Sequence, residues 1–129
     1  MNNMVVLDAS ALLALIQKEP GGEVVQPMIH RAVISTVNLT EVLTVLQKFS
    51  LKTEETLESI TTMIKSVSAF TIEQSKQAAD LHELTKRKGL SLGDRACLAL
   101  GMTLKAPVYT ADKIWKELNL EDIEIQLIR

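Results

Sequence analysis

Four acidic residues share one kind of position in this sequence. Asp8, Glu41, Asp94 and Asp112 each fall where a segment of the chain turns into the start of a helix. Asp8 closes a short apolar run, and Asp112 follows shortly after another. In a parallel α/β sheet the carboxyl ends of the strands meet at one edge, so we expect the four carboxylates to converge in one cleft. Oxygen ligands without His or Cys suit Mg²⁺ or Mn²⁺.

Each acid also has a purely structural interpretation as a helix cap. Asp8 and Asp112 are each placed to cap the helix that follows. Residues 38–41 and 91–94 both have the spacing of a capping box. A carboxylate at a helix start is stabilised by the helix dipole. The functional interpretation therefore depends on all four acids sharing one sheet edge.

The elements that must position these acids follow from the apolar periodicity. The predicted strands cover residues 4–7, 32–37, 69–72, 107–110 and 123–128. The predicted helices cover residues 9–16, 23–31, 39–49, 54–67, 73–88 and 91–105. Strands alternate with helices, and no hairpin turn joins two strands. The chain therefore predicts an α/β fold in which a parallel sheet carries helices on both faces.

Composition limits the class of protein. A chain of 129 residues with 47% apolar and 23% charged residues is expected to form a single soluble domain over residues 1–129. One cysteine excludes an intrachain disulfide. No secretory signal is readable, because Asp8 interrupts the first apolar stretch. No run approaches the roughly 18 apolar residues that cross a bilayer. We expect a cytoplasmic protein without membrane contact.

Several other chemistries are excluded or disfavoured. The net charge of −2 argues against a general nucleic-acid coat protein but not against a nuclease, since a carboxylate metal site itself lowers the charge. No Gly-x-x-x-x-Gly-Lys-Ser/Thr loop and no Gly-x-Gly-x-x-Gly turn is present, which disfavours a nucleotide cofactor. His30 and His82 are isolated, so zinc catalysis has no ligand cluster. Cys97 lies on an apolar helix face and is expected in the core.

Three further polar residues are candidates around the acids. Ser10 and Thr110 offer hydroxyls that would orient a metal-bound water or a phosphate oxygen, or would serve only as turn and cap hydroxyls. Arg95 follows Asp94 directly, where it would contact a phosphate or pair with a neighbouring acid. The basic group 86–88 is expected at a helix C-terminus before a glycine.

Taken together, four segments of the chain resemble the PIN-domain ribonucleases, and among these the VapC toxins of prokaryotic toxin–antitoxin pairs. The segments are residues 5–14 (VVLDASALLA), 38–42 (NLTEV), 90–99 (LSLGDRACLA) and 108–112 (VYTAD). They span most of the chain, and each carries one of the four acids.

The resemblance implies a three-layer α/β/α sandwich around a parallel sheet of about four to five strands. It also implies a Mg²⁺- or Mn²⁺-dependent endoribonuclease that acts on RNA, forms homodimers and is occluded by a cognate antitoxin. Asp8, Glu41, Asp94 and Asp112 would then hold the metal. A catalytically inactive binding module that acts through a partner remains an alternative. A DNA or flap nuclease is disfavoured, because no long insertion is present to clamp branched DNA.

Overall fold

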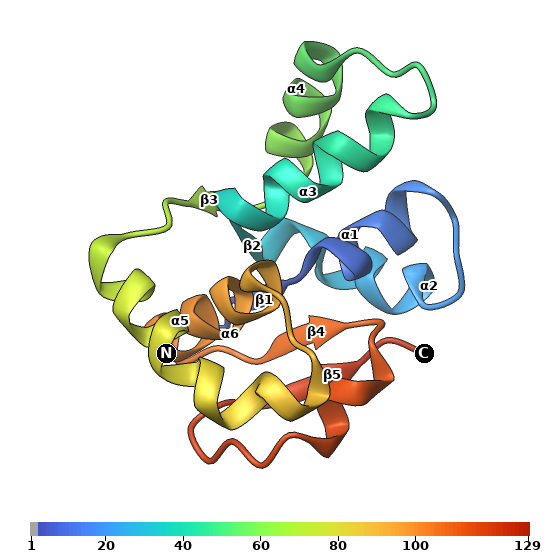
Figure 1. Cartoon of the computed structure of the whole chain (residues 1–129). Coiled ribbons are helices and arrows are strands. Elements are labelled where there is room, and N and C mark those ends of the chain that lie inside the picture. The colour runs from blue at the N-terminus through green and yellow to red at the C-terminus, as the bar shows by residue number, and fades with distance from the viewer. Residues whose placement is uncertain (1–2) are drawn as a thin grey trace.

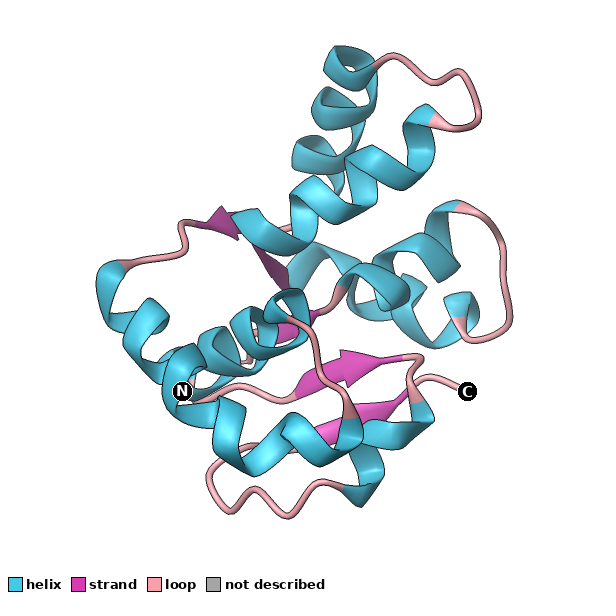
Figure 2. Ribbon diagram, in the orientation of Figure 1, coloured by secondary structure: helices cyan, strands magenta, loops and turns pink. Residues whose placement is uncertain are grey.

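The computed structural model describes residues 3–129, and these residues form a five-stranded parallel sheet (Figure 2). The strands are β1 (Val5–Leu7), β2 (Ala32–Ser35), β3 (Ser66–Ser68), β4 (Val108–Thr110) and β5 (Ile125–Leu127). Their order across the sheet is β3-β2-β1-β4-β5, and every neighbouring pair is parallel. The predicted parallel sheet is therefore confirmed, with β1 at its centre.

Helices cover both faces of this sheet (Figure 1). The α-helices are α1 (Ala9–Ile16), α2 (Gly22–Val25), α3 (Thr36–Gln47), α4 (Thr53–Met63), α5 (Ile72–Thr85) and α6 (Leu92–Leu104). The 3₁₀ helices among the described residues are η1 (Gln26–Arg31), η2 (Lys86–Lys88) and η3 (Lys113–Glu117). Helix α6 lies against the sheet and α5 packs on α6, whereas α3 and α4 lie side by side and extend beyond the sheet. The result is the expected α/β/α sandwich.

Two hydrophobic cores, one on each face, follow from the alternation of side chains along the strands. Val5 and Leu7 point into the core that α1, α3 and α4 close, whereas Val6 points into the opposite core with Val33 and Val108. All three residues of β1 are at most 1% exposed. A central strand buried on both faces reads as a continuous apolar run, as the sequence predicted.

The third predicted strand is wrong in position. It was expected at residues 69–72, but β3 occupies Ser66–Ser68 and Ile72 already begins α5. Strand β3 is an edge strand that pairs only with β2, and its first residue is exposed. An edge strand with half-buried side chains needs no apolar run, so its Ser-Val-Ser sequence gave no periodic signal.

The second strand ends earlier than predicted. Residues 36–37 were expected in the strand, but Thr36 begins α3. Ser35 is the N-cap of α3: it has an extended backbone, and its hydroxyl accepts a hydrogen bond from the Val37 N–H. The cap outweighs the β-branched character of the two residues after it. Helix α4 likewise stops at Met63 rather than at residue 67.

The remaining strands agree with the prediction to within a residue or two at each end. Ser91 caps α6 as expected, and η2 places the basic group 86–88 at a helix C-terminus before Gly89, which has a positive φ. Within residues 3–129, no helix is both long enough and apolar enough to cross a membrane.

Candidate active site

Asp8 sits at the carboxyl end of the central strand and is buried, with 5% of its surface exposed. Its Oδ1 accepts hydrogen bonds from the Ala11 N–H at 2.8 Å and from the Ser10 hydroxyl at 2.7 Å. Its Oδ2 accepts one from the Thr110 hydroxyl at 2.5 Å. Asp8 therefore caps α1, as predicted, and its carboxylate is also held in one orientation by two side chains.

The hydroxyls of Ser10, in the first turn of α1, and Thr110, at the end of β4, link these two elements around the carboxylate of Asp8. Ser10 Oγ accepts a hydrogen bond from the Ala111 N–H at 2.9 Å, and Thr110 Oγ1 accepts one from the Asp112 N–H at 3.0 Å. Both hydroxyl hydrogens are directed at Asp8. In this arrangement the two hydroxyls orient Asp8, and neither has a hydrogen left to donate to a phosphate or a water.

Burial raises the pKa of Asp8 from 3.8 to about 6. The hydrogen bonds from Thr110, Ser10 and Ala11 act in the opposite direction, because they stabilise the charged form. The negative charge of Asp94 adds a further rise. The charged form of Asp8 is therefore destabilised by burial at neutral pH, and a cation beside it would offset that cost.

Glu41 is not part of a capping box, contrary to the prediction for residues 38–41. Because α3 begins at Thr36, Glu41 is well inside the helix and Asn38 is its third residue. The side chain of Glu41 is exposed, and its Oε1 accepts a hydrogen bond from Asn38 Nδ2 at 2.8 Å. The carboxylate also lies against Gly93, in the first turn of α6. Helices from the two faces of the sheet thus meet at this acid.

Asp94 does form the predicted capping box. Its backbone N–H donates to Ser91 Oγ at 3.1 Å, and its Oδ2 accepts from the Ser91 N–H at 3.0 Å. Partial burial raises the pKa of Asp94, and the charge of Asp112 raises it further, whereas Arg95 and the bonds from Ser91 lower it. Repulsion from a neighbouring acid therefore raises the pKa of two of the four acids, Asp8 and Asp94.

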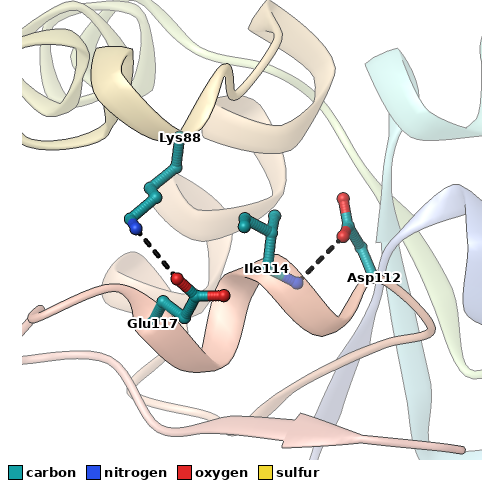
Figure 3. Close-up of polar contacts among 4 residues, drawn as sticks. All are labelled: Lys88, Asp112, Ile114 and Glu117. Carbon is teal, nitrogen blue, oxygen red and sulfur yellow. Dashed lines mark hydrogen bonds and ion pairs between the residues drawn. The ribbon is translucent and has the colours of Figure 1, made fainter.

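Asp112 caps the short helix η3, as predicted, and its side chain is exposed (Figure 3). Its Oδ1 accepts a hydrogen bond from the Ile114 N–H at 3.1 Å. On the next turn of η3, Glu117 forms an ion pair with Lys88 at 2.9 Å. That pair joins η3 to η2, and the amino group of Lys88 is directed at Glu117 rather than at the four acids.

All four acids line one pocket of about 290 Å³, as their places in the sequence predicted. Such a volume has room for on the order of ten water molecules, enough for a hydrated ion. The other lining residues are Ala9, Ser10, Leu13, Asn38 and Val45, so none of the lining side chains is basic. The chain therefore concentrates negative charge in one hollow at the carboxyl edge of the sheet.

The donor set of this pocket fits a hard divalent cation, but the side chains are not yet gathered around one. Within residues 3–129, no three Asp, Glu, His or Cys side chains lie close enough together to hold one ion. Each of the four carboxylates is turned onto a hydrogen bond from the chain beside it. Asp8 is fixed by its hydrogen bonds and Glu41 is held by Asn38, whereas Asp112 is exposed and is held only by the N–H of Ile114. A cation would draw Asp112 toward the other acids.

Arg95 faces away from the pocket. Its Nη1 donates to the carbonyl of Ala78 on α5 at 2.8 Å, and it is not among the lining residues. Its predicted contact with a phosphate stays a prediction. Cys97 is buried, as expected, and burial together with the nearby acids raises the pKa of its thiol well above the ordinary value, so it is no nucleophile. His30 and His82 are exposed.

Sequence reasoning missed Asn38 and Gly93 as members of this site. The sequence indicates Asn38 only as a possible cap, yet its side chain is 1% exposed and bridges α3 to α6. What marks Asn38 and Gly93 is that a buried side-chain amide and a helical glycine both contact the carboxylate of Glu41. That signal becomes readable only when the helix boundaries are known.

A sequence model of the PIN domain family matches residues 5–120 of the chain. No curated protein matches the chain. Among solved structures, the DNA-bound VapBC of Salmonella typhimurium is similar, with a TM-score of 0.74 and 17% identity over 98% of this chain and 99% of that one. VapBC2 of Rickettsia felis, bound to a DNA fragment from the promoter, has a TM-score of 0.72 and 16% identity over 96% and 98%.

A third similar structure is VapC20 of Mycobacterium tuberculosis, described as a toxin that cleaves the sarcin–ricin loop. Its TM-score is 0.74, with 15% identity over 93% of this chain and 98% of that one. At these identities the three structures establish the shared fold.

Proposed function

The chain belongs to the PIN domain family, and from that premise we propose that it is a metal-dependent endoribonuclease, the toxin of a prokaryotic toxin–antitoxin pair. The observation that carries the proposal is the single pocket lined by Asp8, Glu41, Asp94 and Asp112. These acids come from chain segments up to about a hundred residues apart. Parallel topology brings these four chain segments to one edge of the sheet, and an acid on each of them makes the hollow acidic.

In this proposal the four acids hold Mg²⁺ or Mn²⁺. A divalent cation, when bound, polarises a phosphate oxygen and lowers the pKa of a coordinated water. The repulsion that Asp94 exerts on Asp8, and that Asp112 exerts on Asp94, supports this role, because a bound cation would relieve it.

The fixed geometry of Asp8 supports a role as the anchor of the site. Thr110, Ser10 and the Ala11 N–H hold both of its oxygens, so its position does not depend on what binds. The exposed Asp112 provides the movable part of the ligand set, whereas Glu41 is exposed but hydrogen-bonded to Asn38. Arg95 remains a candidate for contact with a phosphate only if it leaves the carbonyl of Ala78.

RNA is the proposed substrate. VapC20 of Mycobacterium tuberculosis, which has this fold, is described as a toxin that cleaves the sarcin–ricin loop. An open pocket at the sheet edge suits an exposed or looped RNA strand, whose phosphates are accessible from the side. Residues 1–129 are proposed to act as one domain, in the cytoplasm.

An antitoxin and a second copy of the chain are the proposed protein partners. The structures from Salmonella typhimurium and Rickettsia felis are VapBC complexes. On this chain, α3 and α4 and the turn between them expose Phe49 (61%), Leu51 (46%) and Leu57 (37%). Apolar side chains exposed in one region are typical of a protein interface, which agrees with the sequence-based expectation for helices 39–49 and 54–67.

The testing experiment is cleavage of a panel of structured RNAs by the purified, antitoxin-free protein with Mg²⁺, with Mn²⁺ and with EDTA. The wild type should cut only when a metal is present, and Asp8→Asn should not cut. Cutting in EDTA, or full activity of a folded Asp8→Asn protein, would refute the proposal.

A catalytically inactive PIN-like binding module is the second candidate. The observation that favours it is that, in the part of the chain the structure describes, no three potential ligands are close enough to hold an ion. Thermal unfolding with and without Mn²⁺ separates the two candidates. A metal site predicts a higher melting temperature in Mn²⁺, and a binding module without metal predicts none.

A further inference from the structure

We propose that Asn38 is a positioning residue for Glu41, which it holds against the first turn of α6 in a space that Gly93 keeps open. The inference rests on the proposed function, because it concerns the affinity of the same acidic pocket for a divalent cation. Neither residue was expected to act there from the sequence.

The contacts of Asn38 fix the orientation of its amide. Nδ2 donates to Glu41 Oε1 at 2.8 Å and to the carbonyl oxygen of Gly93 at 3.0 Å. Both partners are acceptors, so an amide turned the other way would face oxygen with oxygen. One NH₂ group thus ties an acid on α3 to the backbone of α6.

The other end of the same amide has no partner. Asn38 Oδ1 is buried and accepts no hydrogen bond among the described residues. A buried acceptor without a donor destabilises the folded protein. An aliphatic residue of similar size would avoid that loss, so stability alone does not explain an asparagine here. The hydrogen bond from Asn38 to Glu41 explains why an asparagine is present.

Gly93 supplies the space for the carboxylate. A Cβ at this position would lie 2.4 Å from Glu41 Oε2 and 2.7 Å from Glu41 Cδ, closer than real contacts allow. Gly93 is absent from the residues with positive φ, so the backbone does not require a glycine. Glycine inside a helix is unfavourable relative to alanine. The room it leaves lets the carboxylate of Glu41 lie against the first turn of α6, and a Cβ there would displace that carboxylate.

The consequence concerns the preorganisation of the site. Glu41 is exposed, and an exposed glutamate samples many rotamers that a bound cation would have to restrict. Asn38 and Gly93 restrict them in advance, beside the helix turn that carries Asp94. Loss of a residue that orients a metal ligand typically lowers metal affinity by about 10- to 100-fold.

The test measures Mn²⁺ binding by calorimetry, on wild type and variants shown by circular dichroism to be folded. Asn38→Leu keeps the approximate volume and removes both hydrogen bonds, so its Kd should rise by about tenfold or more. Gly93→Ala displaces the same carboxylate while residue 38 remains asparagine, and it should weaken Mn²⁺ binding similarly. It also serves as the second variant if Asn38→Leu does not fold.

Gln74→Leu is the matched control. Gln74 is another buried amide whose Oε1 has no partner, but it lies on α5 and does not line the pocket. Its replacement should leave the Kd for Mn²⁺ unchanged. An equal loss of affinity in Gln74→Leu would show that Asn38→Leu acts through general destabilisation, and would overturn the inference.

A double-mutant cycle with Glu41→Gln decides whether Asn38 acts through Glu41. Glu41→Gln alone should weaken Mn²⁺ binding, and adding Asn38→Leu should weaken it no further. Full additivity, or wild-type affinity in both Asn38→Leu and Gly93→Ala, would refute the inference while leaving the proposed function intact. Absence of Mn²⁺ binding by the wild type would refute the proposed function, and the inference with it.

Discussion

Replacement of Asp8 by asparagine should stabilise the metal-free protein at neutral pH. The variant keeps the size of the side chain and removes its charge. The rise of the Asp8 pKa from 3.8 to about 6 means that the buried anion costs about 3 kcal/mol once both the folded and the unfolded states are ionised. An amide loses part of the hydrogen bonding with Thr110 and Ser10, about 1 kcal/mol. The expected net gain is about 1–2 kcal/mol above pH 7.

The sign of this effect depends on pH. Between pH 4 and 6 the folded protein holds a proton on Asp8 that the unfolded chain has already lost. The wild type should therefore become less stable as the pH rises through this window, and Asp8→Asn should lack that component. Asp94, whose pKa is also raised, remains in both proteins, so the difference between them comes mainly from Asp8, with a smaller part from the lost repulsion between Asp8 and Asp94.

The assay is urea unfolding in EDTA at several pH values from 4 to 8. Trp115 is the single tryptophan and is fully buried, so its fluorescence reports unfolding. In Mn²⁺ at pH 7.5 the wild type should become the more stable of the two proteins, because only the wild type is stabilised by binding the metal. Parallel stability curves for the two proteins, or a loss of stability in Asp8→Asn at pH 7.5 without metal, would refute the reasoning.

Three further outcomes are expected. Thr110→Val removes the donor to Asp8 and the acceptor of the Asp112 N–H, so it should cost about 1–2 kcal/mol in urea unfolding and raise the pKa of Asp8 further in a carboxyl NMR titration; an unchanged pKa would contradict the assigned contact. Leu12→Ala should cost about 2–5 kcal/mol through a core cavity, with unchanged Mn²⁺ affinity in the folded protein; weaker binding would mean that the core shapes the pocket. Cys97 should resist iodoacetamide in the native protein and react fully in urea, as mass spectrometry would show, whereas rapid native labelling would contradict its burial.

The sequence was sufficient for the fold where burial left a periodic signal. The central strand β1 is buried on both faces, and its apolar run predicted it almost to the residue. The edge strand β3 at Ser66–Ser68 gave no such signal, since its stability comes from backbone pairing with β2 rather than from buried side chains. Strand β1 is therefore readable from its apolar run, whereas β3, which has no such run, is not.

The same division applies to the site. The gathering of Asp8, Glu41, Asp94 and Asp112 in one pocket followed from parallel topology alone. The role of Asn38 did not, because the N-cap of α3 is Ser35 rather than residue 38, which turns an apparent cap into a bridge between helices. A shift of three residues in a helix boundary changes which side chains a residue meets, and periodicity does not fix a boundary that well.

The position of β1 at the centre of the sheet also has a consequence for synthesis. The first strand is made early, but one of its neighbours is β4, and the hydroxyl that holds Asp8 comes from a residue 102 positions later. Contacts of such long range form late in folding. While a ribosome is still making the chain, the pocket lacks a wall, and the emerging protein has no assembled site. Chains that end before β4 are therefore expected to lack both the hydroxyl of Thr110 that holds Asp8 and the carboxylate of Asp112.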